Sequence, residues 1–253
     1  MKKIISTLAL GALLSSSLYA DMGRLEMGIG GWSYEPEGTL IYTDSGATAT
    51  NTLTKTKDTS MYAWMLIKHP IPILPNLRLE YANIASDGVA NGSFKDFVAP
   101  VNTATKIEMT QFDVIPYYNL LDNTFWTTLD LGIDLKVIQT DYLAKGVNYD
   151  GLVNADYKDS KDIIIPLAYA RLRVEIPATN LGLETDVKYV TYDGSTVYDV
   201  RAKLDYTFDF IPVVQPALEV GYRVQKFDLK DSDDKTKLDM EFSGFYAGLM
   251  LRF

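Results

Sequence analysis

The chain has 253 residues, with 24 lysines and arginines, 33 aspartates and glutamates, and no cysteine. Its formal net charge of −9 argues against nucleic acid as a partner, and the lack of cysteine excludes disulfides and thiol nucleophiles. Beyond the amino-terminal segment, no charge-free stretch reaches the roughly 18 residues of a membrane helix. The rest of the chain can therefore cross a bilayer only as a closed barrel.

The first residues have the three parts of a secretory signal. Two lysines form a charged start, an apolar run continues to Leu14, and small side chains lead to Ala20. The apolar run is about half as long as the roughly 20 residues of a bilayer helix. We therefore expect residues 1–20 to be a signal peptide and residues 21–253 to form a single exported domain.

Apolar and polar residues alternate along most of this domain, as they do in half-buried strands. The clearest run extends from Leu129 to Ile138, where Asp130, Asp134 and Lys136 face away from the leucines. The alternation predicts about ten strands. They lie at 25–32, 61–68, 77–81, 107–118, 129–138, 168–176, 183–189, 198–208, 218–224 and 243–253.

The predicted connections are of two kinds. Short turns lie near residues 72, 120, 179 and 213, and Asp193-Gly194 marks a tight hairpin, which is a strong signal for two paired strands. Longer polar loops are predicted at Glu35–Thr59, Ser86–Thr105, Asp141–Asp162 and Lys230–Lys237. This asymmetry is typical of outer-membrane barrels, which have short periplasmic turns and longer extracellular loops.

Alternation alone does not decide which face meets lipid, because a soluble lipocalin-like barrel has the same pattern turned inside out. Three features favour an apolar outer wall: the signal, the apolar last strand, and aromatic residues near strand ends, which suit interfacial girdles. These aromatic residues include Tyr206, Phe208, Phe210 and Phe253. We predict an all-β fold, a transmembrane antiparallel up-and-down β-barrel in the cell outer membrane. A secreted soluble barrel is the alternative.

Glycines near the start and an aromatic residue at the end carry a family resemblance. Gly30 and Gly31 precede Trp32, and the last strand ends on Phe253; the glycines also predict a bulge or a close approach of another side chain. The chain resembles a family of small proteobacterial outer-membrane β-barrels with an N-terminal Gly-Gly feature. The resemblance implies the fold and location, but no reaction. It also implies outer-membrane lipid, lipopolysaccharide and the barrel-assembly machinery as partners, and we expect a monomer. The predicted assembly signal comprises Phe245, Leu249, Leu251 and Phe253.

Charged residues on the polar faces predict a lumen filled with ion pairs. Folding the hairpins about 179–180 and 194–195 sets Arg173, Asp186 and Lys203 level, so that opposite charges meet diagonally. About ten strands predict a plugged or very narrow lumen, because open channels come with sixteen or more. Asp130 and Asp134 could instead hold a proton or a cation. The predicted network comprises Asp130, Asp134, Lys136, Arg171, Arg173, Glu175, Glu184, Asp186, Lys188, Arg201, Lys203, Asp205, Glu219 and Arg223.

The sequence predicts no enzyme, no cofactor and no metal site. His69, the single histidine, precedes Pro70 in a predicted periplasmic turn, away from the outer leaflet where barrel hydrolases act, and no serine has the surroundings of a nucleophile elbow. We expect a structural barrel or a passive path for ions or small solutes. Surface binding or adhesion through the extracellular loops is one alternative. An outer-membrane lipid or peptide hydrolase is the other.

Overall fold

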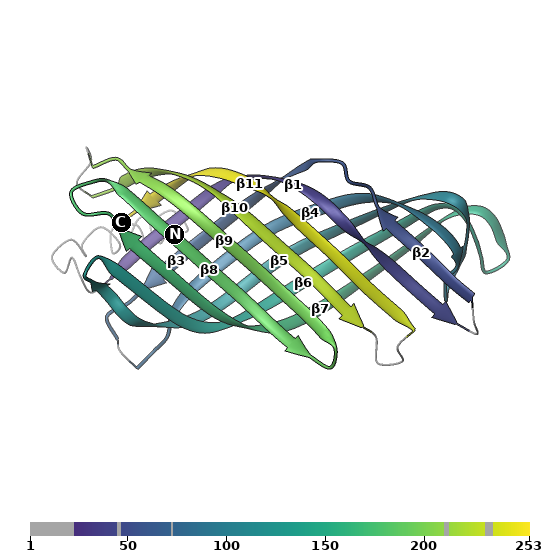
Figure 1. Cartoon of the computed structure of the whole chain (residues 1–253), viewed down its shortest axis with the longest axis horizontal. Coiled ribbons are helices and arrows are strands. Elements are labelled where there is room, and N and C mark those ends of the chain that lie inside the picture. The colour runs from purple at the N-terminus through teal and green to yellow at the C-terminus, as the bar shows by residue number, and fades with distance from the viewer. Residues whose placement is uncertain (1–22, 45–46, 72, 210–212, 231–234) are drawn as a thin grey trace, which may run out of the picture.

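The computed structural model describes residues 23–44, 47–71, 73–209, 213–230 and 235–253. The predicted signal peptide and Phe210 lie outside these ranges. The described residues form long strands joined by turns (Figure 1). Among these residues, no helix is long and apolar enough to span a membrane.

The described residues form eleven strands, which tilt around a common axis (Figure 1). They are β1 (Arg24–Asp44), β2 (Ala47–Leu53), β3 (Asp58–Lys68), β4 (Asn76–Ser93), β5 (Val98–Thr124), β6 (Thr127–Tyr149), β7 (Leu152–Glu175), β8 (Leu181–Tyr192), β9 (Ser195–Thr207), β10 (Gln215–Lys230) and β11 (Thr236–Arg252).

The strands close into an up-and-down antiparallel barrel. From β4 to β11 each strand pairs with the next, and β11 pairs with β1 to complete the ring. Both β2 and β3 pair with β1 on one side and β4 on the other. They share one position in the ring, which is interrupted at residues 54–57. The predicted barrel of about ten strands is confirmed.

Both ends of the described chain lie at the same end of the barrel. Leu25 and Phe253 exchange backbone hydrogen bonds, with N···O distances of 2.9 and 3.4 Å. Barrels of this kind keep both termini in the periplasm. We therefore call this the periplasmic end and the opposite one the extracellular end.

The prediction was wrong for three of the four polar loops at the extracellular end, which are largely strands. Residues 231–234 of the fourth, Lys230–Lys237, lie outside the described residues. Strands β1, β2 and β3 occupy most of Glu35–Thr59, β4 and β5 most of Ser86–Thr105, and β6 and β7 most of Asp141–Asp162. Four residues connect β4 to β5, and two connect β6 to β7. These segments are rich in Thr, Ser, Gly and Asp, which resembles loop composition. Their outer face stands in water, so a polar side chain there is compatible with a strand.

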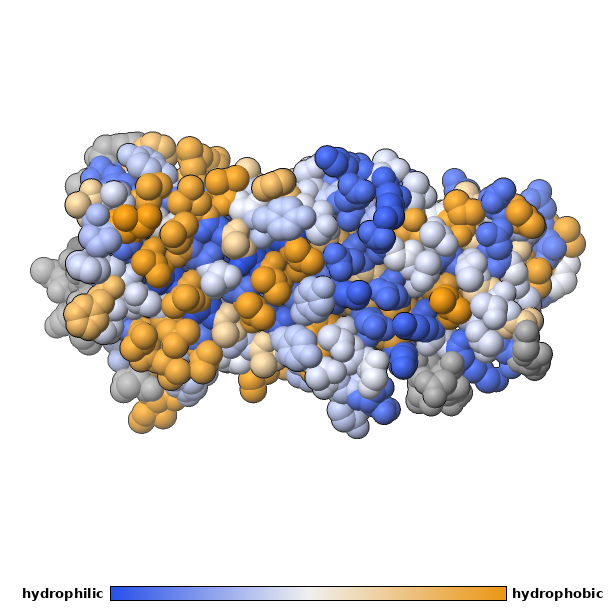
Figure 2. All heavy atoms as spheres, in the orientation of Figure 1, coloured by the Kyte–Doolittle hydropathy of each residue, from blue (hydrophilic) through white to orange (hydrophobic). Residues whose placement is uncertain are grey.

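The outer wall near the periplasmic end is apolar. Leu131, Leu204 and Leu249 are exposed by 43%, 39% and 63%, whereas Asp134 and Lys203 are exposed by only 0% and 7%. In Figure 2, hydrophobic residues gather over the half of the barrel nearer the termini, and a hydrophilic band follows. Apolar side chains therefore point outward, as a lipid-facing wall requires, and the soluble alternative is wrong.

This polarity reverses farther along the barrel. On β6 the inward residues change from Asp134 and Lys136 to Ile138, while the outward residues change from Val137 to Gln139. The first polar residues on the outer face, one on each of eight strands, are Ser33, Thr59, Asn83, Thr110, Gln139, Asp162, Lys226 and Ser243. Beyond this level, in what we call the extracellular section, the barrel is polar outside and apolar inside, as a protein surrounded by water must be.

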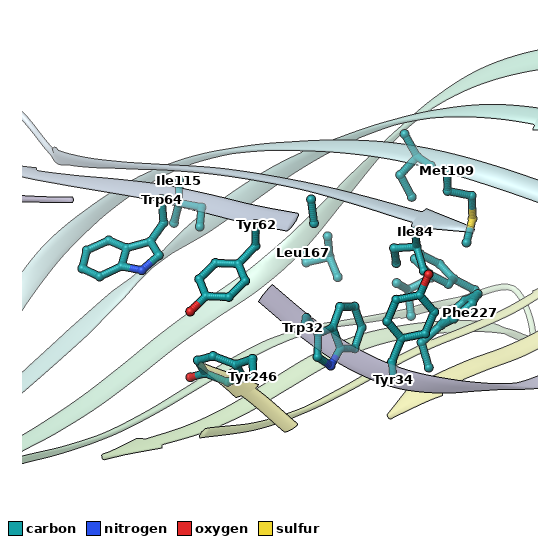
Figure 3. Close-up of a cluster of buried hydrophobic side chains, with 14 of the residues drawn as sticks. Trp32, Tyr34, Tyr62, Trp64, Ile84, Met109, Ile115, Leu167, Phe227 and Tyr246 are labelled. Atoms are coloured by element: carbon teal, nitrogen blue, oxygen red, sulfur yellow. The ribbon is translucent and has the colours of Figure 1, made fainter. Parts of the chain in front are cut away.

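Large aromatic side chains cross the interior just below the extracellular section. Figure 3 shows Tyr62 on β3 pointing toward Tyr246 on β11, with Trp64 beside Tyr62, and the rings of Tyr62 and Tyr246 lie 5.4 Å apart edge to face. A Cβ atom on Gly30 would lie 2.5 Å from the Tyr62 hydroxyl. The predicted close approach at Gly30 is confirmed. Gly31 has only ordinary contacts, and the register of β1 continues without a bulge.

Candidate functional site

The register of β7, β8 and β9 sets opposite charges directly against one another. Glu184 pairs with Arg173 on one side and Lys203 on the other, and Asp186 lies between Arg171 and Arg201. The diagonal arrangement predicted from the sequence is wrong by two residues at each turn.

The turn residues explain this shift. The hairpin is centred on Asp193 and Gly194, with φ of 48° and 74°. The centre predicted from the sequence, at 194–195, is one residue too late. Two successive positive φ angles define the tight type I′ turn that fits the twist of paired strands. The preceding turn also has a positive φ, 61° at Ala178. A turn centre displaced by one residue moves the partner of every strand residue by two.

The middle of the lumen holds two lysines among carboxylates from several strands. The Lys188 Nζ atom lies 2.6 Å from Glu80 and also contacts Asp113, and the Lys136 Nζ atom lies 2.7 Å from Asp113 and 3.5 Å from Asp199. These ammonium groups join β4, β5, β6, β8 and β9 across the barrel. Such pairing offsets the large desolvation cost of each buried charge.

A second layer of charge lies nearer the periplasmic end. Arg171 donates to Asp130 at 2.6 Å and to Glu184 at 2.9 Å. Arg173 donates to both oxygens of Asp205, at 2.6 and 3.1 Å. These two-pronged contacts use the planar guanidinium and resist rearrangement better than a lysine contact does. The layer therefore connects β6, β7, β8 and β9 as well as filling the lumen.

Aromatic side chains pack directly on the charge network. Glu219 accepts hydrogen bonds from the Tyr62 hydroxyl at 2.7 Å and from Trp64 Nε1 at 3.1 Å. The Lys203 Nζ atom lies 4.7 Å from the centre of the Trp64 ring, and the Arg223 guanidinium carbon lies 4.7 Å from that of Trp32, within the range of cation–π contacts. The two lumen cavities beside these residues hold only about 10 Å³ each, roughly the space of one water molecule.

The structure buries every residue of the predicted lumen network except Glu175. The Glu175 side chain is 42% exposed at the periplasmic rim, where it lies 3.4 Å from Arg173 and 3.5 Å from Arg24. Asp134 is buried, and its nearest described cation is Lys188 at 3.7 Å. Sequence reasoning missed further members of the network. They are Glu26, Arg78, Glu80, Asp113, Asp199 and Arg252.

The alternation of apolar and polar residues in the sequence is sufficient to predict several of these missed residues. Arg78 and Glu80 lie between Leu77, Leu79 and Tyr81, so they occupy the inner face of their predicted strand. Among the described residues, the buried charged side chains number nine cations and ten anions. The near balance is consistent with a network in which each charge has a partner.

A cavity of about 540 Å³ lies at the extracellular end, in the apolar interior of the extracellular section. Its volume is within the 300 to 1,000 Å³ range typical of small-molecule sites. The lining residues come from six strands and one turn. They are Leu40, Tyr42, Phe94, Lys95, Asp96, Phe97, Ile107, Met109, Ile138, Thr140, Tyr142, Tyr157, Asp159, Lys161, Ile163, Phe227, Leu229, Lys230, Thr236, Leu238 and Met240.

The turn between β4 and β5 covers part of this cavity with stacked rings. The ring centres of Phe94 and Phe97 lie 4.8 Å apart, and Phe97 lies 4.8 Å from Tyr157. Burial raises the pKa of the Tyr157 hydroxyl, and the nearby carboxylates of Asp159 and Asp96 raise it further. Tyr157 therefore remains a neutral hydrogen-bond donor at neutral pH, beside an apolar wall.

Comparisons with known proteins identify the fold and nothing finer. No family model matches the chain, and no curated protein matches it. Among solved structures, the outer membrane protease OmpT from Escherichia coli aligns with a TM-score of 0.56 and 11% identity, over 91% of this chain and 96% of that chain. The translocator domain of the autotransporter NalP from Neisseria meningitidis aligns with a TM-score of 0.44 and 14% identity, over 100% of this chain and 96% of that chain. The Gly-Gly family feature stays a prediction.

The first of these comparisons corrects the prediction that the chain is not an enzyme. That prediction depended largely on His69, which lies half-buried in the periplasmic turn with its Nε2 atom 3.0 Å from the Pro75 carbonyl oxygen. A barrel of the same fold is a protease, and carboxylates also act as general acids and bases. The histidine count therefore does not exclude catalysis. The chain has the fold of an outer-membrane β-barrel. The apolar outer wall between the periplasmic rim and the extracellular section, which we call the apolar belt, fits that membrane.

Proposed function

We propose that this protein is an outer-membrane barrel with a closed lumen that binds a small ligand at its extracellular end. One observation carries the proposal: the lumen cavities of about 10 Å³ each contrast with the extracellular cavity of about 540 Å³. The space available to a ligand therefore lies outside the charged layer. A binding function at the cell surface fits this distribution better than a passive path for solutes.

Lipid, lipopolysaccharide and the barrel-assembly machinery are the partners we propose for the barrel itself, which we expect to be a monomer. The outward side chains of Phe245, Leu249 and Leu251 are 69%, 63% and 38% exposed, and Phe253 is 42% exposed. Their accessibility supports the proposal that they form the assembly signal. Replacing Phe253 with Ser should lower the amount of folded barrel in the outer membrane, as measured by heat-modifiable migration of membrane fractions.

Conductance across planar bilayers tests the closed lumen. In molar potassium chloride, we expect the reconstituted protein to give no stepwise currents, because the described charged side chains pair across the lumen. An open porin inserted into the same membranes serves as the positive control. Steady currents of porin size would contradict the closed lumen and favour the passive path.

Binding of N-phenyl-1-naphthylamine, a neutral fluorescent probe, tests the extracellular cavity. Thr140 lines the cavity, whereas the adjacent Gln139 faces outward and is exposed. In lipid nanodiscs, the wild-type protein and the Gln139→Trp variant should give more probe fluorescence than the cavity-filling Thr140→Trp variant. Equal fluorescence from all three, with heat-modifiable migration preserved, would contradict ligand binding at this end.

A further inference from the structure

We infer that the ligand of the extracellular cavity is an anionic amphiphile, a molecule with one apolar chain or ring system and a negatively charged head group. This inference rests on the proposed binding function and adds the chemistry of the ligand. It combines three independent features of the extracellular section: an apolar interior, lysines that form no ion pair with any acidic residue in the described ranges, and a strand edge that leaves one side open.

The apolar interior selects the body of the ligand. The deepest part of the cavity is lined by Met109, Ile138, Phe227 and Met240, all of which are at least 96% buried. Below them the lumen becomes charged, so the apolar space ends at a defined depth. Water gains no hydrogen bonds from such walls, whereas an aliphatic or aromatic body gains contact with them. The cavity therefore favours a body of limited length.

Lysines at the rim select the head group. Lys95, Lys161 and Lys230 line the cavity, and none of them has an ion pair with a described acidic residue. In the lumen, by contrast, the buried cations are paired, as Lys136 is with Asp113 at 2.7 Å. The rim also contains two carboxylates, so the lysines exceed the acids by one. The Lys230 ammonium lies against the β8–β9 turn, 3.4 Å from where a Cβ of Gly194 would be. An anionic head placed beside the Lys95 or Lys161 ammonium group would gain charge-assisted hydrogen bonds that a neutral or cationic head could not form.

The unpaired edge of β7 provides an entry route to the cavity for an amphiphile. Strand β7 pairs with β8 only from Ala168 toward the periplasmic end. Within the described part of the chain, residues 152–167 of β7 pair with β6 alone. Figure 1 shows β5, β6 and β7 continuing past the end of the β8–β9 hairpin. This gap begins beside the outward Ile164 and Pro166 and continues past Asp162. It therefore spans the extracellular edge of the apolar wall, the level where an amphiphile in the outer leaflet holds its head group.

Titration calorimetry with four eight-carbon probes tests the inference on protein in phosphatidylcholine nanodiscs, with empty nanodiscs subtracted. Octanoate and octyl phosphate carry anionic heads, octanol a neutral one and octylammonium a cationic one. We expect saturable binding of an anionic probe at least about tenfold tighter than that of octylammonium. A preference for octyl phosphate over octanoate would identify a lipid-phosphate head, and the reverse a free carboxylate; either supports the inference.

Two lysines on one strand provide a matched pair of variants. Lys161 lines the cavity, whereas Lys158 lies on the opposite face of β7 and is exposed. The Lys161→Met variant should lose most of the preference for anionic probes, and Lys158→Met should keep it. Equal binding of octanoate and octylammonium to the wild type would overturn the anionic assignment. If that occurs while the neutral naphthylamine probe still distinguishes Thr140→Trp from Gln139→Trp, the proposed binding function stands and only its ligand chemistry is wrong.

Discussion

The ammonium group of Lys188 on β8 lies 2.6 Å from the carboxylate of Glu80 on β4, on the other side of the barrel lumen. Strands β5, β6 and β7 separate the two along the sheet. Arg201 on β9 reaches the same carboxylate from the neighbouring strand. The two walls are therefore connected through the interior as well as around the ring, and opening a path would require these pairs to separate.

Removing the Lys188 charge should destabilise the barrel strongly. Lys188→Met keeps an unbranched apolar side chain but leaves Glu80 and Asp113 without a shared cation. Leaving a buried charge without any partner costs about 3–5 kcal/mol. The loss should lie toward the lower end of this range, because Arg201 still contacts Glu80 and Lys136 still contacts Asp113. Urea unfolding in lipid vesicles, followed by tryptophan fluorescence, would measure the loss. Lys106→Met is the control, because Lys106 and Glu108 form an exposed pair that should contribute little. A similar loss for both variants would show that the lumen pair is not special.

A positive charge on the outer wall should be costly only within the apolar belt. Ile133 and Gln139 both face outward on β6, Ile133 within the belt and Gln139 beyond it. Arginine facing lipid at the membrane midplane costs about 2–4 kcal/mol. Ile133→Arg should therefore lower the free energy of unfolding by an amount in that range, and Gln139→Arg should change it far less. Equal effects would place the lipid boundary elsewhere.

Gly28 should tolerate no side chain, although nearby Gly31 should. A Cβ atom on Gly28 would lie 2.4 Å from Trp64 Nε1, whereas one on Gly31 would meet its nearest atom at 3.8 Å. Overpacking of this kind costs about 1–3 kcal/mol. Unfolding measurements on Gly28→Ala and Gly31→Ala should give a clear loss for the first and little change for the second. Adding Trp64→Leu should reduce the penalty of Gly28→Ala, since the clash is with that ring.

The Tyr34 hydroxyl replaces backbone hydrogen bonds beside the break between β2 and β3. It donates to the Ala85 carbonyl at 2.9 Å and accepts from the Ala85 amide at 2.8 Å, close to where the break at residues 54–57 interrupts the strand beside β4. Tyr34→Phe should cost about 1–3 kcal/mol, because buried polar groups then lose their partner. Hydrogen exchange should become faster at the Ala85 amide. Unchanged protection at that amide would mean that water replaces the hydroxyl without loss.

Strand direction and the polarity of the wall could be read from the sequence because both depend on side-chain alternation. If the barrel spans a membrane, the positions of Leu131 and Asp134 on opposite faces of one strand show which face meets lipid and which faces the lumen. The register was less accessible. It depends on which residues take positive φ in each turn, and the pair Asp193-Gly194 decides the partners of Asp186 and Lys203.

The strands and the cavity of the extracellular section could not be predicted from the sequence. The change from Lys136 to Ile138 on the inner face and from Val137 to Gln139 on the outer face is visible in the chain, but it resembles the end of a strand when the surroundings are unknown. The cavity was also inaccessible, since its walls combine residues as distant as Leu40 and Met240. Only the closed ring brings them together.

The exchange of apolar and polar faces along every long strand also fixes how deeply the molecule sits. A barrel displaced toward the cell interior would carry Asp162 and Ser243 among acyl chains, and one displaced outward would leave Leu131 and Leu249 in water. Either movement is opposed on eight strands at once. The residues of the outer wall therefore determine a single depth of the barrel in the membrane. This depth keeps the mouth of the cavity at a constant height relative to the lipid.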